Sequence, residues 1–240
     1  MIDNTTGRSV LITGGNRGIG LAIAKAFLAK GDKVAVTYRS KTELPEGILG
    51  VRADVTDSAS VDAAFKEVEA AHGSVEVLIP NAGITKDTLL MRMTEDDFTS
   101  VLDANLNGSF RVIQRATRGM MKLRKGRIVL ISSVSGIYGA PGQVNYSASK
   151  AGMIGIARSI TRELGGRGIT ANVVMPGVVL TDMFNEVSDE VKQKYMEDIP
   201  AARFAEPSEI ANVVRWLASD EASYISGAVI PVDGGASMGH

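Results

Sequence analysis

The chain contains no cysteine, which excludes disulfides, thiolate nucleophiles and cysteine-ligated metal sites. Histidine is almost as scarce: His72 and His240 are the only two and lie far apart in the sequence. Because zinc sites depend on clustered histidine and cysteine ligands, we predict neither a zinc enzyme nor any other metal site. Long hydrophobic runs are also missing. The most apolar stretches, such as VVMPGVVL at 173–180, are far shorter than the ~20 residues that cross a bilayer.

Neither sign of charge dominates, with 26 lysines and arginines against 27 acidic residues and a formal net charge of -1. This balance gives no overall attraction to nucleic acid or to an anionic membrane. The first residues, MIDNTTGRSV, lack the basic start and apolar core of a secretory signal. We therefore predict a soluble, cytoplasmic protein that neither binds nucleic acid nor spans a membrane.

Hydrophobic residues make up 45% of the 240 residues, which is ample for the core of one α/β domain. Short apolar runs alternate with longer segments of helical period, and this alternation is typical of βαβ units around a parallel sheet. We predict one doubly wound, Rossmann-type domain over residues 1–240, with helices on both faces of the sheet. The expected strands lie at 9–13, 33–38, 48–53, 75–80, 127–132, 169–176 and 228–235.

The segment TGGNRGIG, at 13–20, joins the first expected strand to the first expected helix. Gly14, Gly18 and Gly20 allow a tight turn, close approach of phosphates and close packing of the helix start. The amino end of that helix adds free N–H groups and a partial positive charge for a pyrophosphate. Glycine-rich loops also occur for turn geometry alone, but the position after an opening strand predicts dinucleotide binding.

The second expected strand indicates which dinucleotide is bound. An NAD enzyme usually carries an acid there to hold the ribose hydroxyl, whereas this strand ends in Thr37, Tyr38, Arg39 and Ser40. Arg39, together with Arg17 of the glycine loop, can clamp a 2′-phosphate; the alternative is two solvated surface arginines. We predict NADPH/NADP⁺. Adenine is expected against Asp54 and Val55, although Asp54 alone could be only a helix cap.

The segment YSASK places Tyr146 and Lys150 four residues apart, on one face of a helix. A nearby ammonium favours the phenolate, so we expect Lys150 to lower the pKa of Tyr146 and make it a usable proton donor. Ser133 lies shortly upstream and can hold a carbonyl oxygen while Tyr146 protonates it. Taken singly, the pair could be a helix-surface contact and the serine a cap.

Eight short segments follow one another along the chain: TGGNRGIG, DV, NAG, ANLNG, SSVSG, YSASK, NVVMPGVVLTDM and SGAVIPVDGG. In their order and spacing the chain resembles the short-chain dehydrogenase/reductase family over essentially its whole length. The resemblance implies a Rossmann-type sheet and nicotinamide-dependent carbonyl reduction or alcohol oxidation. It implies Ser133, Tyr146 and Lys150 as catalytic residues, with Asn105 as a fourth that holds a water linking Lys150 to bulk solvent. We expect cofactor contacts from Arg39, Asp54, Val55, Tyr146 and Lys150. The resemblance implies further contacts from Gly14, Asn16, Arg17, Gly18, Ile19, Asn81, Ala82, Gly83, Pro176, Gly177, Val179 and Thr181.

Within that family the segments GQVNYSASKAGMIG, RGITANVV and SYISGAVIPVDGG are similar to 3-oxoacyl-[acyl-carrier-protein] reductases, and most to the mycobacterial long-chain type. This similarity implies NADPH-dependent reduction of 3-oxoacyl-acyl-carrier-protein to the 3-hydroxyacyl product, in fatty acid synthesis or elongation. Two residues depart from the pattern. Pro80 removes a backbone donor at a strand end, and Tyr138 replaces a tryptophan near the expected substrate mouth.

The region at about 180–206 departs from the strand–helix rhythm. It carries apolar residues at three- and four-residue intervals, which indicates one apolar helix face. Two interpretations stay open: a lid over an acyl chain, or a helix whose apolar stripe packs on the domain. The residues are Phe184, Val187, Val191, Tyr195 and Ile199.

A basic cluster leads into the fifth expected strand, and its members are Arg118, Lys122, Arg124, Lys125 and Arg127. Arg167 precedes the sixth expected strand. These basic residues can steer an acidic acyl carrier protein, although cations also favour helix carboxyl ends for local reasons. The family resemblance favours the carrier for Arg124 and Arg167. It also implies a homotetramer, built through the helices containing Asn105 and Tyr146 and through the last strand.

Two other functions stay open at this point. One is a reductase of another ketone, such as a steroid, a quinone or a small carbonyl compound. The other is a non-catalytic NADP(H)-binding regulator, which would tolerate loss of Ser133, Tyr146 or Lys150, all of which this chain retains.

Overall fold

A computed structural model describes residues 7–40, 43–181 and 189–239 of the chain. Its centre is a seven-stranded sheet of order β3-β2-β1-β4-β5-β6-β7, in which every neighbouring pair is parallel. This confirms the predicted doubly wound α/β fold and each predicted strand. The strands are β1 (Ser9–Ile12), β2 (Lys33–Tyr38), β3 (Ile48–Arg52), β4 (Val77–Ile79), β5 (Gly126–Ile131), β6 (Ile169–Pro176) and β7 (Val229–Val232).

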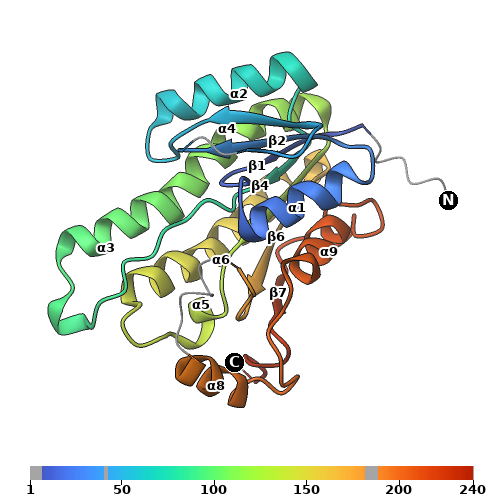
Figure 1. The fold of residues 1–240 in the computed structure, drawn as a ribbon. Helices are drawn as coiled ribbons and strands as arrows, with labels where there is room; N and C mark the ends of the chain where they lie inside the picture. The colour runs from blue at the N-terminus through green and yellow to red at the C-terminus, as the bar shows by residue number, and fades with distance from the viewer. Residues whose placement is uncertain (1–6, 41–42, 182–188, 240) are drawn as a thin grey trace.

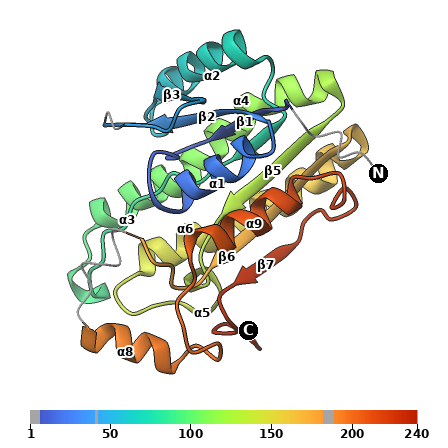
Figure 2. The same ribbon diagram turned by 45° about the vertical axis from the view of Figure 1, so that its right-hand side comes forward.

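Helices cover both faces of the sheet (Figure 1). One face carries α1 (Gly18–Leu28) and α9 (Pro207–Leu217), whereas the other carries α2 (Ser58–His72), α4 (Gly108–Leu123) and α6 (Val144–Leu164). Figure 2 shows α5 (Ser135–Tyr138) and α8 (Asp189–Glu197) at the end of the sheet to which the arrowheads of β5 and β7 point. A short α3 (Glu95–Leu102) continues through a π-helical turn, Asp103–Asn107, into α4; two 3₁₀ turns lie at Leu90–Arg92 and Gly165–Arg167.

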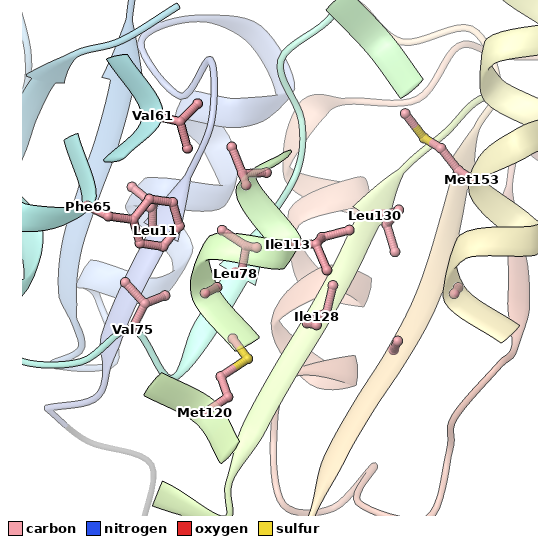
Figure 3. Packing of buried hydrophobic residues seen from close by; sticks show 14 of the residues in the cluster. Leu11, Val61, Phe65, Val75, Leu78, Ile113, Met120, Ile128, Leu130 and Met153 are labelled. Atoms are coloured by element: carbon pink, nitrogen blue, oxygen red, sulfur yellow. The ribbon is translucent and has the colours of Figure 1, made fainter. Parts of the chain in front are cut away.

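The strands bury side chains on both faces, as expected for a parallel sheet covered by helices. In β5, Ile128 and Leu130 face α2, α4 and α6, whereas Val129 and Ile131 face α1 and α9. Figure 3 shows the first of these two cores, where Leu11, Leu78, Ile128 and Leu130 of the sheet meet residues of the helices. Those helix residues include Val61, Phe65, Ile113, Met120 and Met153.

Pro80 does not end the pairing of β4 with β5. The residue is buried, and its carbonyl accepts the N–H of Ile131 at 3.0 Å. A proline lacks a donor but keeps its acceptor, so the ladder runs one residue beyond β4. In the part of the chain that the structure describes, no helix combines the length and apolar character needed to span a membrane.

Candidate active site

A cleft of ≈ 700 Å³ lies at the carboxyl ends of the strands, where the strand order reverses between β1 and β4. Such a switch point is the usual ligand site of open α/β sheets. The cleft brings together residues from the glycine loop, from the ends of β2 to β6 and from α6. Among the sequence-predicted site residues, those lining it are Gly14, Asn16, Arg17, Gly18, Ile19, Arg39, Asp54, Val55, Asn81, Ala82, Gly83, Ser133, Tyr146, Lys150, Pro176, Gly177, Val179 and Thr181, while Asn105 lies behind the wall.

The glycine loop folds tightly against the end of β4. Gly14 has φ +61°, and a Cβ there would lie 3.0 Å from Ala82 Cα. A Cβ at Gly20 would lie 2.6 Å from Gly14 O and 2.7 Å from Asn81 Nδ2. The glycines therefore permit this close approach of the loop to the strand end, as the motif predicts.

Asn81 holds the loop in this shape. Its Nδ2 donates to Thr13 O at 2.9 Å and to Gly14 O at 3.0 Å, and its backbone N–H donates to Thr13 Oγ1 at 3.0 Å. Helix α1, which follows the loop, begins after Arg17 without a side-chain cap. Its first N–H groups therefore face the cleft without a side-chain acceptor at the cap, an arrangement that favours an anion.

Two arginines flank the end of the cleft beside β2. Arg17 and Arg39 are both exposed and both line it. Asp54 is the one acid among the described lining residues, and its Oδ1 accepts the N–H and hydroxyl of Thr56 at 2.9 and 2.7 Å. These hydrogen bonds, with a smaller effect of Arg39, lower the pKa of Asp54. This end of the cleft therefore offers two cations and a carboxylate already engaged in its own turn.

Lys150 is held rigidly at the opposite end of the cleft. Its Nζ donates to Ile131 O at 2.8 Å, and its side chain is nearly buried. Ser132 Oγ donates to the Lys150 carbonyl at 2.8 Å, which ties α6 to the end of β5. Nζ lies 5.5 Å from the centre of the Tyr146 ring. Burial lowers the pKa of Lys150 to about 8.

Tyr146 differs from the expectation in one respect. Burial raises its pKa to about 12, the hydrogen bond with Ser133 partly offsets this rise, and the charge of Asp87 adds to it. We expected Lys150 to lower this pKa, but desolvation is the larger effect. Tyr146 therefore stays protonated near neutrality, which is the form that a proton donor requires.

Ser133 presents its hydroxyl beside Tyr146. Its Oγ accepts the hydroxyl of Ser135 at 3.0 Å and the N–H of Ser135 at 3.3 Å. Because these bonds occupy the oxygen as an acceptor, the Ser133 proton is left to donate. Ser133 and Tyr146 together form a pair of hydroxyl donors at one point of the cleft.

Asn105 is fully buried, and its carboxamide is engaged by the backbone of Ile84 and the hydroxyl of Ser149. Oδ1 accepts the Ile84 N–H at 2.8 Å, while Nδ2 donates to Ile84 O at 3.0 Å and to Ser149 Oγ at 3.1 Å. A Cβ on Gly83 would lie 3.1 Å from Asn105 Oδ1 and 3.6 Å from Lys150 Nζ. Asn105 thus lies next to Lys150, behind Gly83; its role in a water relay stays a prediction.

One residue that sequence reasoning missed is Asn145, which is fully buried beside Tyr146. Its Nδ2 donates to Lys86 O and to Asp97 O, both at 3.0 Å, and its Oδ1 accepts the Tyr146 N–H at 2.7 Å. It therefore joins the loop after β4, the α3 region and the start of α6. The available signal was an amide side chain directly before the tyrosine of YSASK.

The expected lid falls partly outside the described residues: Phe184 and Val187 lie there, as do the side chains of Val191 and Tyr195. Ile199 is buried, and a Cβ on Gly234 would lie 3.0 Å from its Cγ2. At the two ends of this region the chain pairs with itself, since Leu180 N–H donates to Ala205 O at 2.9 Å and Ala205 N–H donates to Val178 O at 3.0 Å.

The basic cluster is smaller than expected and lies away from the cleft. Arg127 is buried, and its Nη2 pairs with Asp220 at 3.2 Å, so its inclusion in a surface cluster was wrong. Arg124 donates from Nη2 to Gly166 O at 3.4 Å, which places it beside the turn containing Arg167. Arg124 precedes β5 and Arg167 precedes β6, whereas the cleft is at the carboxyl ends of the strands.

Comparison with known proteins gives consistent relatives. A family model described as Enoyl-(Acyl carrier protein) reductase matches residues 14–237. The chain is 57% identical over 233 residues to the 3-oxoacyl-[acyl-carrier-protein] reductase MabA of Mycobacterium tuberculosis, covering 97% of this chain and 94% of the relative. It is 57% identical to MabA of Mycobacterium avium, covering 97% and 91%. It is 46% identical over 242 residues to the 3-oxoacyl-[acyl-carrier-protein] reductase FabG of Staphylococcus aureus, covering 96% and 98%.

Proposed function

The chain belongs to the short-chain dehydrogenase/reductase family, and from this premise we propose that it reduces 3-oxoacyl-[acyl-carrier-protein] to the 3-hydroxyacyl product with NADPH, a reduction step of fatty acid synthesis. The observation that carries the proposal is the pair of hydroxyl groups of Ser133 and Tyr146 beside the buried Lys150, at one end of the cleft. The printed names of the relatives support the substrate class.

The residues of the cleft fit a nicotinamide dinucleotide. Gly14 and Gly20 leave no room for a side chain, and the uncapped start of α1 offers N–H groups to a pyrophosphate. Arg17 and Arg39 would hold a 2′-phosphate, which supports NADPH over NADH. Bound there, NADPH supplies the hydride that the carbonyl carbon receives.

The chain's own residues control the proton. Tyr146 is the acid that protonates the carbonyl oxygen, and the Ser133 hydroxyl donates a hydrogen bond to the same oxygen as negative charge develops on it. Loss of the proton leaves a phenolate, which the ammonium of Lys150 and the Ser133 hydroxyl stabilise. Lys150 is fixed for this role by its hydrogen bond to Ile131 O at 2.8 Å.

The description of the family model names enoyl reduction, whereas the relatives are named as 3-oxoacyl reductases. The two reactions differ in where the proton goes: to an oxygen in a ketone reduction, to a carbon in an enoyl reduction. In a ketone reduction the oxygen that carries the developing charge also receives the proton, and Ser133 and Tyr146 place a hydrogen-bond donor and a proton donor at one such oxygen. This arrangement favours the ketone.

The carrier protein, the assembly and the cellular location complete the proposal. Arg118, Lys122, Arg124 and Arg167 would attract an acidic carrier. Exposed apolar side chains on α4 support a homotetramer built through that helix; they are Phe110, Met121 and Leu123. Because the basic residues and the cleft lie at opposite ends of β5 and β6, a carrier bound there would serve the cleft of another subunit. A cytoplasmic location fits an enzyme of this step.

NADPH consumption by the purified protein tests the proposal, with a 3-oxoacyl thioester, the matching trans-2-enoyl thioester and an unrelated cyclic ketone as substrates. We expect turnover of the 3-oxoacyl thioester in clear preference to the other two. Preference for the enoyl thioester would contradict the assigned proton transfer, and preference for the cyclic ketone would contradict the substrate class. NADPH binding without turnover of any of them would indicate a regulator.

A further inference from the structure

The helix that forms the back of the cleft contains the π-helical turn Asp103–Asn107. Leu102 before it and Gly108 after it both have right-handed helical backbone angles, so α3, the turn and α4 form one continuous helix. A π turn is wider and rarer than an α turn, and it often marks a functional site. Here the turn places Ala104 in the cleft lining and Asn105 against Ile84.

Arg111, one turn further along α4, holds this π turn. Its Nη2 donates to Asp103 Oδ1 at 2.7 Å, and its Nη1 lies 3.4 Å from the Asp103 carbonyl. The same Nη1 donates to the Val55 carbonyl at 3.2 Å. Val55 follows β3 and lines the end of the cleft where adenine is expected. A single guanidinium thus joins the loop after β3 to the turn that carries Asn105.

The start of α4 also touches Val55 directly. A Cβ at Gly108 would lie 2.8 Å from Val55 Cγ2 and 3.0 Å from Val55 Cβ. Gly108 has an ordinary helical φ of -60°, so its lack of a side chain provides space for Val55 and is not required by the backbone conformation. A movement of the π turn would therefore displace Val55.

From Asn105 the contacts continue to the catalytic helix. Asn105 Nδ2 donates to Ser149 Oγ at 3.1 Å, and Ser149 Oγ donates to the Tyr146 carbonyl at 2.7 Å. Val55, Arg111, Asn105 and Tyr146 are thus linked by contacts that run from one end of the cleft to the other.

We propose that Arg111 is a positioning residue for the reduction: through Asp103 it fixes the π turn that places Asn105 beside Lys150, and through the Val55 carbonyl it fixes the adenine end of the cofactor site. This inference rests on the proposed function, because it takes the Val55 end of the cleft as the adenine site of NADPH and the Lys150 end as the site of proton transfer. Arg111 touches no reacting atom and acts only by holding other groups in place.

The competing explanation is an ion pair that only stabilises the fold. The side chains of Arg111 and Asp103 are 23% and 37% exposed, and pairs with that much solvent contact contribute little to stability. Under that explanation, replacing Arg111 lowers the melting temperature and leaves cofactor affinity and turnover unchanged.

The test compares Arg111→Met, Arg111→Lys and Asp103→Ala with wild type. NADPH affinity is read by fluorescence titration and kcat with a 3-oxoacyl N-acetylcysteamine thioester. For Arg111→Met we expect kcat to fall about 10- to 100-fold, as small misplacements can cause, and the NADPH Kd to rise about 5-fold. For Asp103→Ala we expect a similar fall in kcat and a Kd within about 2-fold of wild type, because the bond to Val55 remains.

Arg111→Lys keeps a charge near Asp103, but one ammonium cannot reproduce the planar fork that spans both partners. It should therefore recover kcat more than Kd. Arg158→Met is the matched control, since Arg158 is an exposed arginine on α6 away from the cleft lining, and it should change neither quantity. The proposal would be overturned if all folded Arg111 and Asp103 variants kept the wild-type kcat and NADPH Kd. Equal losses of kcat and affinity in Arg158→Met would also overturn it. If Arg111→Met fails to fold, Arg111→Lys and Asp103→Ala decide.

A second pair of variants tests the contact without touching Arg111. Gly108→Ala should raise the NADPH Kd, whereas Gly119→Ala in the same helix should not, because a Cβ there meets nothing closer than 3.5 Å. Equal Kd values for both would contradict the coupling of α4 to Val55. NADPH binding needs no acyl substrate, so the titrations still test Arg111 if wild type fails to reduce a 3-oxoacyl thioester and the proposed function falls.

Discussion

Tyr146 and Lys150 show how burial, more than their mutual distance, sets the protonation of the site. Removing the pair from water opposes the charged form of each, so the pKa of Tyr146 rises to about 12 and that of Lys150 falls to about 8. Near neutrality the tyrosine is protonated and the lysine is largely an ammonium. Ketone reduction requires this combination, because Tyr146 then carries the proton that it donates and the Lys150 ammonium stabilises the phenolate that forms.

A pH profile tests this combination. We expect kcat/KM for NADPH, which reports the free enzyme, to fall as the pH rises through about 8, because Lys150 then loses its charge. Tyr146 remains protonated over that range. In Lys150→Arg the guanidinium stays charged, so the alkaline fall should move to higher pH even if the maximal rate is lower. A wild-type profile that is flat up to about pH 10, near the ordinary pKa of lysine, would contradict the role of the ammonium.

Arg39 carries the prediction on cofactor choice. Arg39→Asp removes the proposed charge-assisted hydrogen bond to the 2′-phosphate of NADPH and puts a carboxylate that repels this phosphate in its place. We therefore expect the NADPH Kd to rise about 10- to 100-fold and the ratio of NADPH to NADH activity to fall. Arg52→Asp is the matched control, because Arg52 is exposed at the end of β3 and does not line the cleft. Equal selectivity in wild type and Arg39→Asp would show that Arg39 is only a surface residue.

At the scale of elements, the sequence predicted most where one local rule decides the structure. The strands of alternating or continuous apolar residues were all confirmed, and the glycine loop lies where its motif predicts, between β1 and α1. The continuous helix formed by α3 and α4 contains a π turn that no hydrophobic periodicity indicated, because this turn is stabilised by Arg111 and by the distant Ile84. The burial of Arg127 likewise depends on Asp220, which is remote in sequence.

The glycine loop gives the prediction at this scale. Gly20→Ala places a methyl group within 3 Å of Gly14 O and Asn81 Nδ2, so we expect the loop to shift and NADPH affinity to fall about 10-fold or more. Gly155→Ala, in α6, is the control: a Cβ there meets nothing within 4 Å, and alanine favours a helix. Isothermal titration with NADPH measures both. Unchanged affinity in a folded Gly20→Ala protein would contradict the close packing of the loop.

At the scale of the whole molecule, the cleft and the basic residues lie at opposite ends of the sheet. Lys122 lies near the end of α4, and Arg124 and Arg167 precede β5 and β6, while the catalytic groups follow β5 or lie on α6. No reading of a single strand or helix could have shown this separation, because it follows from the parallel order of the sheet.

Replacement of both Arg124 and Arg167 by glutamine tests the carrier surface. We expect kcat/KM for a 3-oxoacyl-[acyl-carrier-protein] to fall about 10-fold at low salt and to lose much of its salt dependence. Activity on the uncharged N-acetylcysteamine thioester should be unchanged, since the cleft is untouched. Equal effects on both substrates would indicate a structural role for the two arginines and remove the carrier from this surface.

The most direct test of the proposed chemistry is turnover of a 3-oxoacyl thioester with NADPH by wild type and by Tyr146→Phe, with NADPH Kd measured for both. We predict that wild type forms one 3-hydroxyacyl thioester for each NADPH consumed. Tyr146→Phe should bind NADPH with nearly the same Kd and lose at least about 100-fold in kcat, because the ring remains and only the proton donor is removed. A Tyr146→Phe protein with near wild-type kcat would contradict the assignment of Tyr146 as the acid.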